Sequence, residues 1–377
     1  MDWEQVYDAY PVNRQLIWLN NCGTVPAGEH IKEAQARYLA GYAQEGVFSR
    51  VAPYADTLAR IKVLLSGLLN CLPREVTLVH HTAEGMLFVS QGLDLGPGDE
   101  VVLLENEYPS NVYPWRNLAS KGVRMVAVPP GEHPDQFIDE LSRRLTPRTR
   151  VVSLSAVHWC TGMPLPLTRV GELCRERGIT FVVDGAQGVG HQPVDPHRDG
   201  VDYMAFSAWK WLMGPLGLGG FFVARDKLED LQPAFWATGS VVDDETYLPY
   251  RDELKPDADR FILSTPNFGD WVYFLAALKF LDAIGFERAR QRILELNAYL
   301  AAGLSDKGFT VLSDRFPEYP TGITVCRKTG LDAAALVGQL KAQGIVVAAR
   351  LGSLRLAPHI YNSFSQLDRV LDILRRI

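Results

Sequence analysis

Two short apolar runs, each followed by polar side chains, constrain the fold of this chain more than any other feature. Residues 180–183 form the first run, which leads into Asp184, and residues 201–206 form the second, which leads into Ser207. Runs of this length and composition indicate buried strands. Because ligands of α/β proteins bind at the edge of the sheet where the strands end, the sequence predicts an α/β fold with a ligand site near residues 184 and 207–210.

Lys210 follows the second run and stands between Trp209 and Trp211. Desolvation among apolar neighbours lowers the pKa of a lysine and makes its amine available as a nucleophile. Such a lysine can form a Schiff base with pyridoxal phosphate, and a carboxylate such as Asp184 can keep the ring nitrogen of that cofactor protonated. We therefore interpret Lys210 and Asp184 as catalytic residues. For either residue taken alone, a solvated surface position is the more common alternative.

The length and charge of the chain exclude several classes of partner. A chain of 377 residues can bury a large core, and its length suggests two domains. The formal net charge is -6 and no basic block occurs, so we expect no nucleic-acid partner. The acidic start at residues 1–5 is not typical of a signal peptide, and no apolar run is long enough to span a bilayer. We expect a cytoplasmic protein without a membrane partner.

The cysteines do not suggest a metal site. No two of them have CxxC spacing, so neither zinc binding nor a redox pair is indicated. An odd number scattered over a long chain is typical of reduced cytosolic thiols. We predict no bound metal for the five cysteines, which are Cys22, Cys71, Cys160, Cys174 and Cys326.

A longer pattern around the two apolar runs resembles a known family. It consists of residues 184–187, Asp-Gly-Ala-Gln, the segment 201–210 that ends in Ser-Ala-Trp-Lys, and the glycine-rich segment 214–223. In combination these motifs resemble class V aminotransferases of fold-type I. That family includes cysteine desulfurases, selenocysteine lyases, isopenicillin N epimerases and kynureninases. The resemblance extends from about Trp18 to the C-terminus.

The resemblance implies the α/β fold of fold-type I pyridoxal phosphate-dependent transferases. Such a fold has a large domain with a mostly parallel seven-stranded sheet, to which we assign residues 1–265, the N-terminal segment included. A small C-terminal α+β domain, residues 266–377, fits the mixed helical and strand patterns that follow Trp271. The resemblance also implies pyridoxal 5′-phosphate as the cofactor and a homodimer with shared active sites.

Hydrophobic periodicity and turn residues predict further elements along the chain. Helices are expected at residues 29–42, 54–69, 86–93, 167–178, 271–285, 286–304, 331–343 and 365–377. Strands are expected at residues 75–79, 101–104, 150–155, 310–312, 321–325, 345–348 and 354–357.

The strand at residues 75–79, a polar turn and a helix form a phosphate-binding pattern, because backbone N–H groups and the helix dipole point at the anion. By resemblance, Thr82 and Ala83 contact the cofactor phosphate. Ser207 would bind it through its hydroxyl, and Trp209 has an indole N–H to donate. Thr265 would reach the phosphate of the neighbouring subunit, and helix capping is its alternative role.

Further residues are assigned to the cofactor ring and the substrate. By resemblance, Tyr108 stacks on the ring and Gln187 reaches its oxygen. Arg355 would hold the α-carboxylate of the substrate as a fork, and Asn21 would lie near the substrate. Arg350 could meet a second acidic group or lie on the surface.

His158 follows the strand at residues 150–155. Because imidazole charges near physiological pH, it could orient the substrate or shuttle a proton. We assign it a catalytic role, with a purely structural role as the alternative.

The reaction type is narrowed by one departure from the desulfurases. Those enzymes carry a nucleophilic cysteine in a loop before the substrate arginine, whereas residues 348–355 contain none, so a persulfide mechanism is not expected. With Lys210 as the base for the α-proton, transamination, β-elimination and epimerisation all remain open. We interpret the chain as aminotransferase-like, since that reaction needs no group beyond Lys210. A β-eliminating C–S lyase or an epimerase is the alternative. A non-catalytic protein of this fold is disfavoured because Lys210, Asp184, Gln187 and Arg355 are intact.

Overall fold

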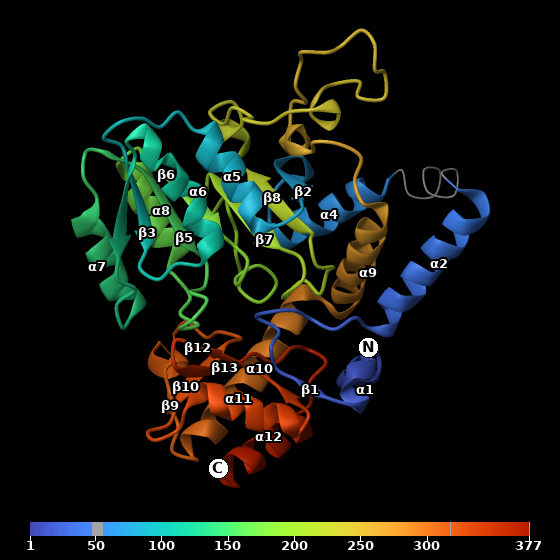
Figure 1. Cartoon of the computed structure of the whole chain (residues 1–377), viewed down its shortest axis with the longest axis vertical. Coiled ribbons are helices and arrows are strands. Elements are labelled where there is room, and N and C mark those ends of the chain that lie inside the picture. Colours follow the sequence, from blue (N-terminus) through green and yellow to red (C-terminus); the bar gives the residue numbers. More distant parts are fainter. Residues whose placement is uncertain (47–55, 317, 377) are drawn as a thin grey trace.

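The computed structural model describes residues 1–46, 56–316 and 318–376. Its larger part is built on a seven-stranded sheet with the strand order β2-β8-β7-β6-β5-β3-β4 (Figure 1). Only β8 runs antiparallel to its two neighbours, and the remaining pairs are parallel. The predicted mostly parallel α/β sheet is therefore confirmed. The strands are β2 Val76–Val79, β3 Glu100–Leu104, β4 Arg124–Val128, β5 Thr149–Ser155, β6 Thr180–Asp184, β7 Tyr203–Ser207 and β8 Gly219–Val223.

Eleven helices are described besides the short 3-10 turns, and several of them cover both faces of this sheet. They are α1 Trp3–Asp8, α2 Glu29–Glu45, α4 Thr57–Leu69, α5 Thr82–Gly92, α6 Tyr113–Arg116, α7 Pro134–Arg144, α8 Leu167–Glu176, α9 Phe268–Ile284, α10 Phe286–Ser305, α11 Ala333–Ala342 and α12 Phe364–Arg376. Within the described ranges, none of these helices has the length and apolarity that crossing a membrane requires. Two ends of predicted helices lie outside the described residues: the start of the helix expected at residues 54–69 and the last residue of the helix expected at residues 365–377.

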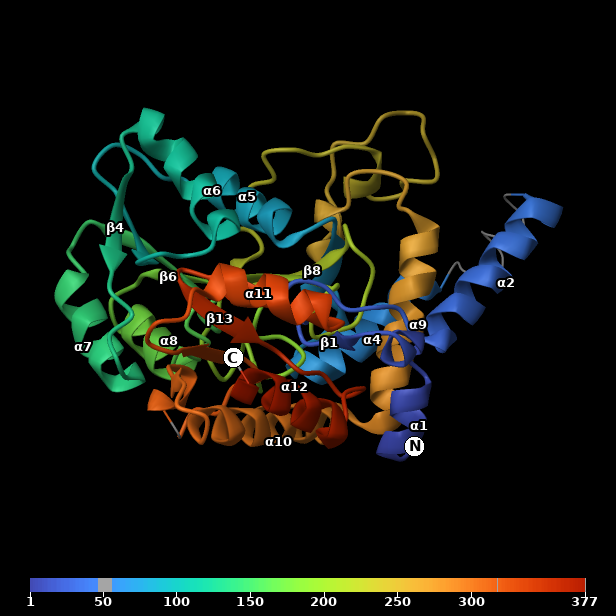
Figure 2. The ribbon, with the colours of Figure 1, turned by 60° about the horizontal axis from the view of Figure 1, so that its bottom comes forward.

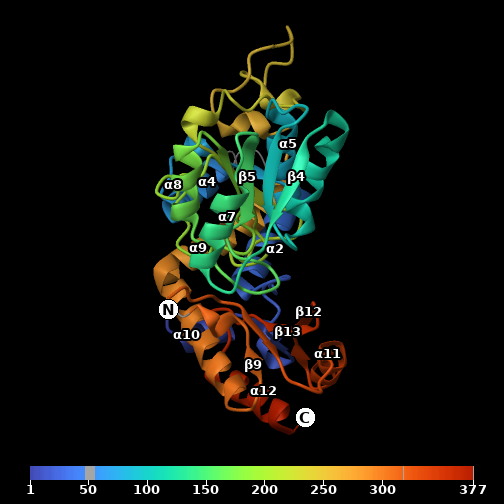
Figure 3. The same ribbon diagram turned by 90° about the vertical axis from the view of Figure 1, so that its left-hand side faces the viewer.

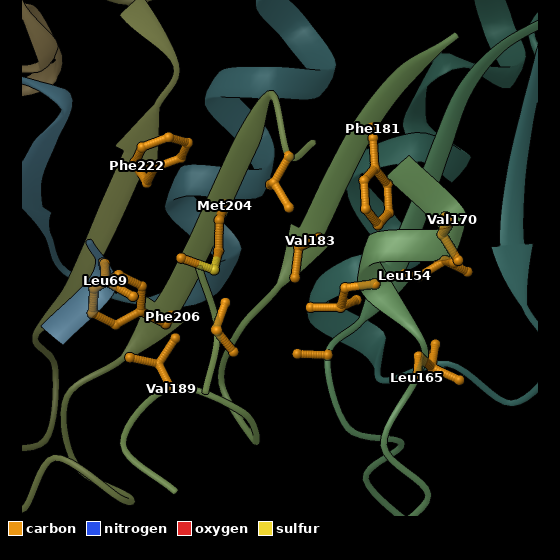
Figure 4. Packing of buried hydrophobic residues seen from close by; sticks show 14 of the residues in the cluster. Leu69, Leu154, Leu165, Val170, Phe181, Val183, Val189, Met204, Phe206 and Phe222 are labelled. Carbon is orange, nitrogen blue, oxygen red and sulfur yellow. The ribbon is translucent and has the colours of Figure 1, made fainter. Parts of the chain in front are cut away.

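The sheet is buried on both faces, which explains why its strands are almost continuously apolar. Alternate residues of β6 enter opposite cores: Phe181 and Val183 pack toward α4, α7, α8 and α9, while Val182 packs toward α5 and α6. Figure 4 shows the first core, with Met204 of β7 next to Val183. The sheet is thereby fixed as a rigid platform whose strand ends face the smaller part of the molecule (Figure 3).

The smaller part is a four-stranded antiparallel sheet with the order β12-β13-β10-β9. Helices α10, α11 and α12 contribute leucines to its core. The expected small α+β domain is thus present near the C-terminus. Its strands are β9 Thr310–Val311, β10 Thr324–Arg327, β12 Ala348–Arg350 and β13 Ser353–Leu356.

The N-terminal segment reaches the small domain. Strand β1, Ile17–Trp18, pairs in parallel with β11, Ile345–Val346. Figure 2 shows β1 beside the small domain. The N–H of Ala357 then donates to the carbonyl of Leu19 at 2.7 Å. Helix α9, in contrast, packs on α2 and α4 of the large part. A boundary between residues 265 and 266 therefore stays a prediction.

Candidate active site

A cavity of about 370 Å³ lies where β6 and β7 end and the small domain approaches the sheet. This is the edge at which the sequence places the ligand site. Residues that were singled out from the sequence and line the cavity are Thr82, Ala83, Tyr108, Asp184, Gln187, Ser207, Trp209, Lys210, Arg350 and Arg355. Cys22, Gly23, His81, Ser110, Trp159 and Ala186 also line it and were not assigned to the site.

Lys210 and Asp184 are both buried, with 8% and 3% of their surface exposed. Burial lowers the pKa of Lys210, although the negative charge of Asp184 opposes this shift. Burial also raises the pKa of Asp184, against the opposing charge of Lys210. Oδ1 of Asp184 accepts the N–H of Ala186 at 2.9 Å, which fixes the carboxylate at the strand end. The pair therefore combines a readily deprotonated amine with an oriented carboxylate.

Tyr108 covers one side of Lys210. Nζ of Lys210 lies 5.6 Å from the centroid of the Tyr108 ring. The backbone N–H of Tyr108 donates to Oε1 of Glu107 at 2.7 Å, and Oε2 of Glu107 accepts the N–H of Ser155 at 2.8 Å. Burial and the charge of Asp184 raise the pKa of Glu107 to about 7. Sequence reasoning did not single out Glu107, because a glutamate in a loop gives no sign of burial.

The N-terminus of α5 forms one end of the cavity. His81 caps the helix, since its Nδ1 accepts the N–H of Glu84 at 3.0 Å. The hydroxyls of Thr82 and Ser207 lie 3.3 Å apart. Free N–H groups, the helix dipole and two hydroxyls make this end suited to an anion such as a phosphate.

Two arginines from the small domain also line the cavity. Arg355 on β13 is buried, and its Nη1 donates to the carbonyl of Trp159 at 2.7 Å, whereas its Nε has no partner among the described residues. Burial and the nearby Arg355 lower the pKa of Arg350, which is only partly buried. Together with Lys210 they outnumber Asp184, the one carboxylate among the described residues that line the cavity. The cavity therefore favours an anionic ligand.

His158 is not brought into the cavity. Its Nδ1 lies 2.9 Å from Oγ1 of Thr161 and its Nε2 lies 3.3 Å from the carbonyl oxygen of Asn106. Burial lowers the pKa of His158 to about 4, so the ring is neutral at physiological pH. The neighbouring Trp159 lines the cavity in its place.

Asn21 and Thr265 also lie outside the cavity wall. Asn21 is buried, donates to the carbonyl of Ala357 at 2.6 Å and accepts the hydroxyl of Tyr361 at 2.6 Å. Thr265 is exposed, and α9 is capped by the side chain of Asn267. A capping role for Thr265 is therefore wrong, and a role toward a neighbouring subunit stays a prediction.

Comparison with known proteins agrees with this geometry. A model of the aminotransferase class-V family matches residues 17–366, which is most of the chain. The chain belongs to the aminotransferase class-V family. Its curated relatives include a probable cysteine desulfurase of Pyrococcus abyssi, 24% identical over 99% of this chain and 97% of that protein. Isopenicillin N epimerase of Amycolatopsis lactamdurans is 28% identical over 100% of this chain and 98% of that protein.

Two solved structures of C-DES resemble this class-V enzyme over nearly its whole length. One is a mutant with glycine covalently linked to the pyridoxal phosphate cofactor. It has a TM-score of 0.90 and 25% identity, and the match covers 97% of this chain and 98% of that chain. The other is described as the cystine C–S lyase C-DES in complex with its reaction product, cysteine persulfide. It has a TM-score of 0.89 and 26% identity, and covers 97% of this chain and 99% of that chain.

The cavity of this class-V enzyme fits pyridoxal phosphate, its cofactor. A buried amine and a buried carboxylate face one cavity, and the N-terminus of α5 offers an anion seat at one end. Lys210 would carry the cofactor and Asp184 would pair with its ring nitrogen. Thr82, Ala83 and Ser207 would hold its phosphate.

We expect three buried histidines to make the fold sensitive to acid. Burial lowers the pKa of His158 and His359 to about 4 and that of His191 to about 3. The pKa of histidine in the unfolded chain is near 6.5. Near that pH each buried ring therefore binds fewer protons in the folded than in the unfolded protein. Its contribution to the free energy of unfolding is complete above pH 6.5 and is lost as the pH falls toward the folded value.

We expect His191→Phe to reduce this acid sensitivity. Both ring nitrogens of His191 lack a partner among the described residues, so the substitution removes no hydrogen bond. Between pH 7 and pH 5, the variant should lose about 2 kcal/mol less stability than the wild-type protein. Urea unfolding at both pH values measures this difference, from which any pH-independent packing cost cancels. Equal losses in the two proteins would contradict the prediction.

Proposed function

We propose that this class-V enzyme is a β-eliminating C–S lyase that acts on a sulfur-containing amino acid, with cystine as the best candidate. The hairpin between β12 and β13 carries this proposal. Arg350 pairs with Ser353, so only Leu351 and Gly352 form the turn, with φ angles of 46° and 74°. Two positive φ angles are typical of a tight type I′ turn. This segment has no room for a mobile loop with a sulfur-accepting cysteine.

The relatives support elimination over the aminotransferase reaction that was the first interpretation of the sequence. They are described as a desulfurase, an epimerase and a cystine C–S lyase. Cys22 does line the cavity, so it is the one alternative sulfur acceptor among the described lining residues. Burial raises the pKa of its thiol, which disfavours the nucleophilic thiolate. Sulfur is therefore expected to leave with the product.

When bound, pyridoxal phosphate supplies an electron sink next to the α-carbon of the substrate. The residues of this chain then have separate tasks. Arg355 holds the α-carboxylate, and its buried, unpartnered Nε fits a forked contact. The Lys210 amine takes the α-proton. Asp184 would stabilise the positive charge on the ring nitrogen of the cofactor. Tyr108 and Trp159 add aromatic surface to the cavity wall.

The overall reaction balances for cystine. One Cβ–S bond breaks, and its electron pair leaves with the disulfide sulfur as cysteine persulfide. The three-carbon remainder takes up one water and leaves as pyruvate and ammonia. Cystine carries a second carboxylate, which gives Arg350 a partner beside Arg355. Arg350 and Arg355 both line the cavity, so each of the two carboxylates of cystine has a candidate arginine partner.

Products of the holoenzyme test this proposal. We expect cystine to yield pyruvate, ammonia and cysteine persulfide in equal amounts, with the cofactor retained. Formation of an oxo acid together with pyridoxamine phosphate would instead establish transamination, and inversion at the α-carbon without release would establish epimerisation. A persulfide on Cys22, detected by mass spectrometry of the protein, would establish a desulfurase. A Cys22→Ala variant is the control, and its activity should persist.

We also propose a homodimer with shared active sites. Support comes from the segment of residues 236–250, which projects from the body of the molecule (Figure 1). Its aromatic side chains line one shared hollow. Trp236, Tyr247 and Tyr250 have 49%, 73% and 87% of their surface exposed. Clustered exposed aromatics of this kind mark association surfaces. Thr265, close in the chain and also exposed, would then be available to the partner.

Light scattering checks the assembly. We expect a mass of twice the 42.0 kDa of the chain, and a large loss of dimer when Trp236 and Tyr250 are both replaced by Ser. Leu72→Ser, at another exposed apolar residue, is the matched control and should stay dimeric. Wild-type protein that remains monomeric at micromolar concentration would contradict the proposal.

A further inference from the structure

A row of five buried aromatic rings contacts the cavity wall. The rings, here called the aromatic row, are His191, Trp211, His359, Tyr361 and Tyr10. Successive centroids are 4.0, 5.8, 5.8 and 4.3 Å apart. The members come from the turn after β6, the segment after Lys210, the segment after β13 and the N-terminus. The row therefore joins the large part, the small domain and the N-terminal segment.

One hydrogen bond joins the aromatic row to the cavity wall, and a second reaches the residue that precedes a wall residue. Nε1 of Trp211 donates to Oε1 of Gln187 at 3.1 Å. The hydroxyl of Tyr361 donates to Oδ1 of Asn21, which directly precedes Cys22. Nε2 of Gln187 in turn donates to the carbonyl of Cys22 at 2.9 Å. The side-chain amide of Gln187 is thus held from both ends.

The chemistry of these neighbours allows only one orientation of the amide. An indole N–H can only donate, and a backbone carbonyl can only accept. Oε1 of Gln187 must therefore face Trp211, and Nε2 must face Cys22. Nε2 carries two hydrogens, of which the Cys22 carbonyl takes one. The second remains for a ligand in the cavity that Gln187 lines.

We propose that Trp211 is a positioning residue that makes Gln187 a hydrogen-bond donor toward the bound cofactor. Without the indole N–H, the amide could turn by half a rotation and present its oxygen to an acceptor on the cofactor. The role concerns the cofactor alone, so it goes beyond the proposed C–S lyase reaction and does not depend on it.

Cofactor titration of the apoprotein tests this role. We expect Trp211→Phe, which keeps an aromatic ring in the row, to raise the Kd of pyridoxal phosphate about tenfold, the effect of one lost hydrogen bond. The visible absorption maximum of the holoprotein should shift as well. Trp115→Phe is the matched control, because the Trp115 indole is equally buried and donates to Asn111 and Ser153, away from the cavity. Its Kd should stay within about twofold of wild type, and equal effects of the two variants would overturn the proposal.

Double substitution separates positioning from general packing. If Trp211 acts through Gln187, Trp211→Phe should add little to the Kd change of Gln187→Ala, because the amide is already gone. Additive effects would overturn the proposal.

A second comparison leaves the aromatic row intact and so needs no Trp211 variant. Gln187→Glu keeps an acceptor for the indole but removes the donor toward the cavity. We expect it to bind pyridoxal phosphate more weakly than Gln187→Ala. Tighter binding by Gln187→Glu would mean that an oxygen is tolerated at this position and would refute the assigned orientation.

Discussion

Lys210→Ala is expected to abolish the covalent attachment of pyridoxal phosphate and to lower kcat by about 10³-fold or more. The amine is the candidate nucleophile for the cofactor and the candidate base for the α-proton, so the substitution removes two functions at once. Lys210 is buried, and burial lowers its pKa, which keeps more of the amine neutral than at a surface lysine. Borohydride reduction followed by peptide mass spectrometry should find the cofactor on Lys210 in the wild-type protein and nowhere in the variant.

The control for this prediction is an exposed lysine outside the cavity. Lys279 on α9 meets this condition, and Lys279→Ala should keep both the covalent cofactor and the activity. Noncovalent cofactor binding by Lys210→Ala should persist, since the anion seat at the N-terminus of α5 is unchanged. A variant that still shows a reducible link to the protein would contradict the assignment of Lys210.

Arg355→Ala is expected to lower kcat/KM for amino-acid substrates by about 10²-fold or more, mainly through a higher KM. Removing a buried charged partner costs about 2–5 kcal/mol, and 2.7 kcal/mol corresponds to about 10²-fold. Because Arg355 lies on β13, away from the anion seat on α5, the Kd of pyridoxal phosphate should change by less than about threefold. Steady-state kinetics and cofactor titration measure the two quantities. Equal losses of cofactor and substrate binding would assign Arg355 a structural role.

Two variants sharpen this prediction. Arg355→Lys keeps the positive charge but lacks the planar fork, so its kcat/KM should fall between the wild type and Arg355→Ala.

Arg350→Ala should lower kcat/KM for cystine more than for a sulfur amino acid with a single carboxylate, since Arg350 is the candidate partner of the second carboxylate. The same loss for both substrates would remove Arg350 from substrate recognition.

Much of the large domain could be predicted because buried parallel strands have nearly continuous apolar sequences. Strands β5 and β6 lie within one residue of their expected bounds. Strand β8 was not expected, since glycine pairs are rare in strands. Its structure explains them: a Cβ on Gly220 would lie 2.2 Å from the Phe206 ring, and one on Gly219 would lie 2.3 Å from the Phe206 carbonyl oxygen. Close approach to β7 requires glycine there.

The active site likewise combines residues that the sequence pattern placed and residues that only the tertiary structure placed. Asp184 and Lys210 reach the cavity because strand ends in parallel sheets converge on one edge, which the sequence pattern alone determined. The sequence did not determine which neighbour faces the cavity in irregular segments. Trp159 lines it while His158 turns away, and Cys22 lines it while Asn21 turns away. In a strand the side chains alternate by rule, but in a turn the local backbone angles decide, and tertiary contacts set those angles. Only the tertiary structure could bring Gln187, Cys22 and Trp211 together, because their hydrogen bonds join segments 24 and 165 residues apart in the chain.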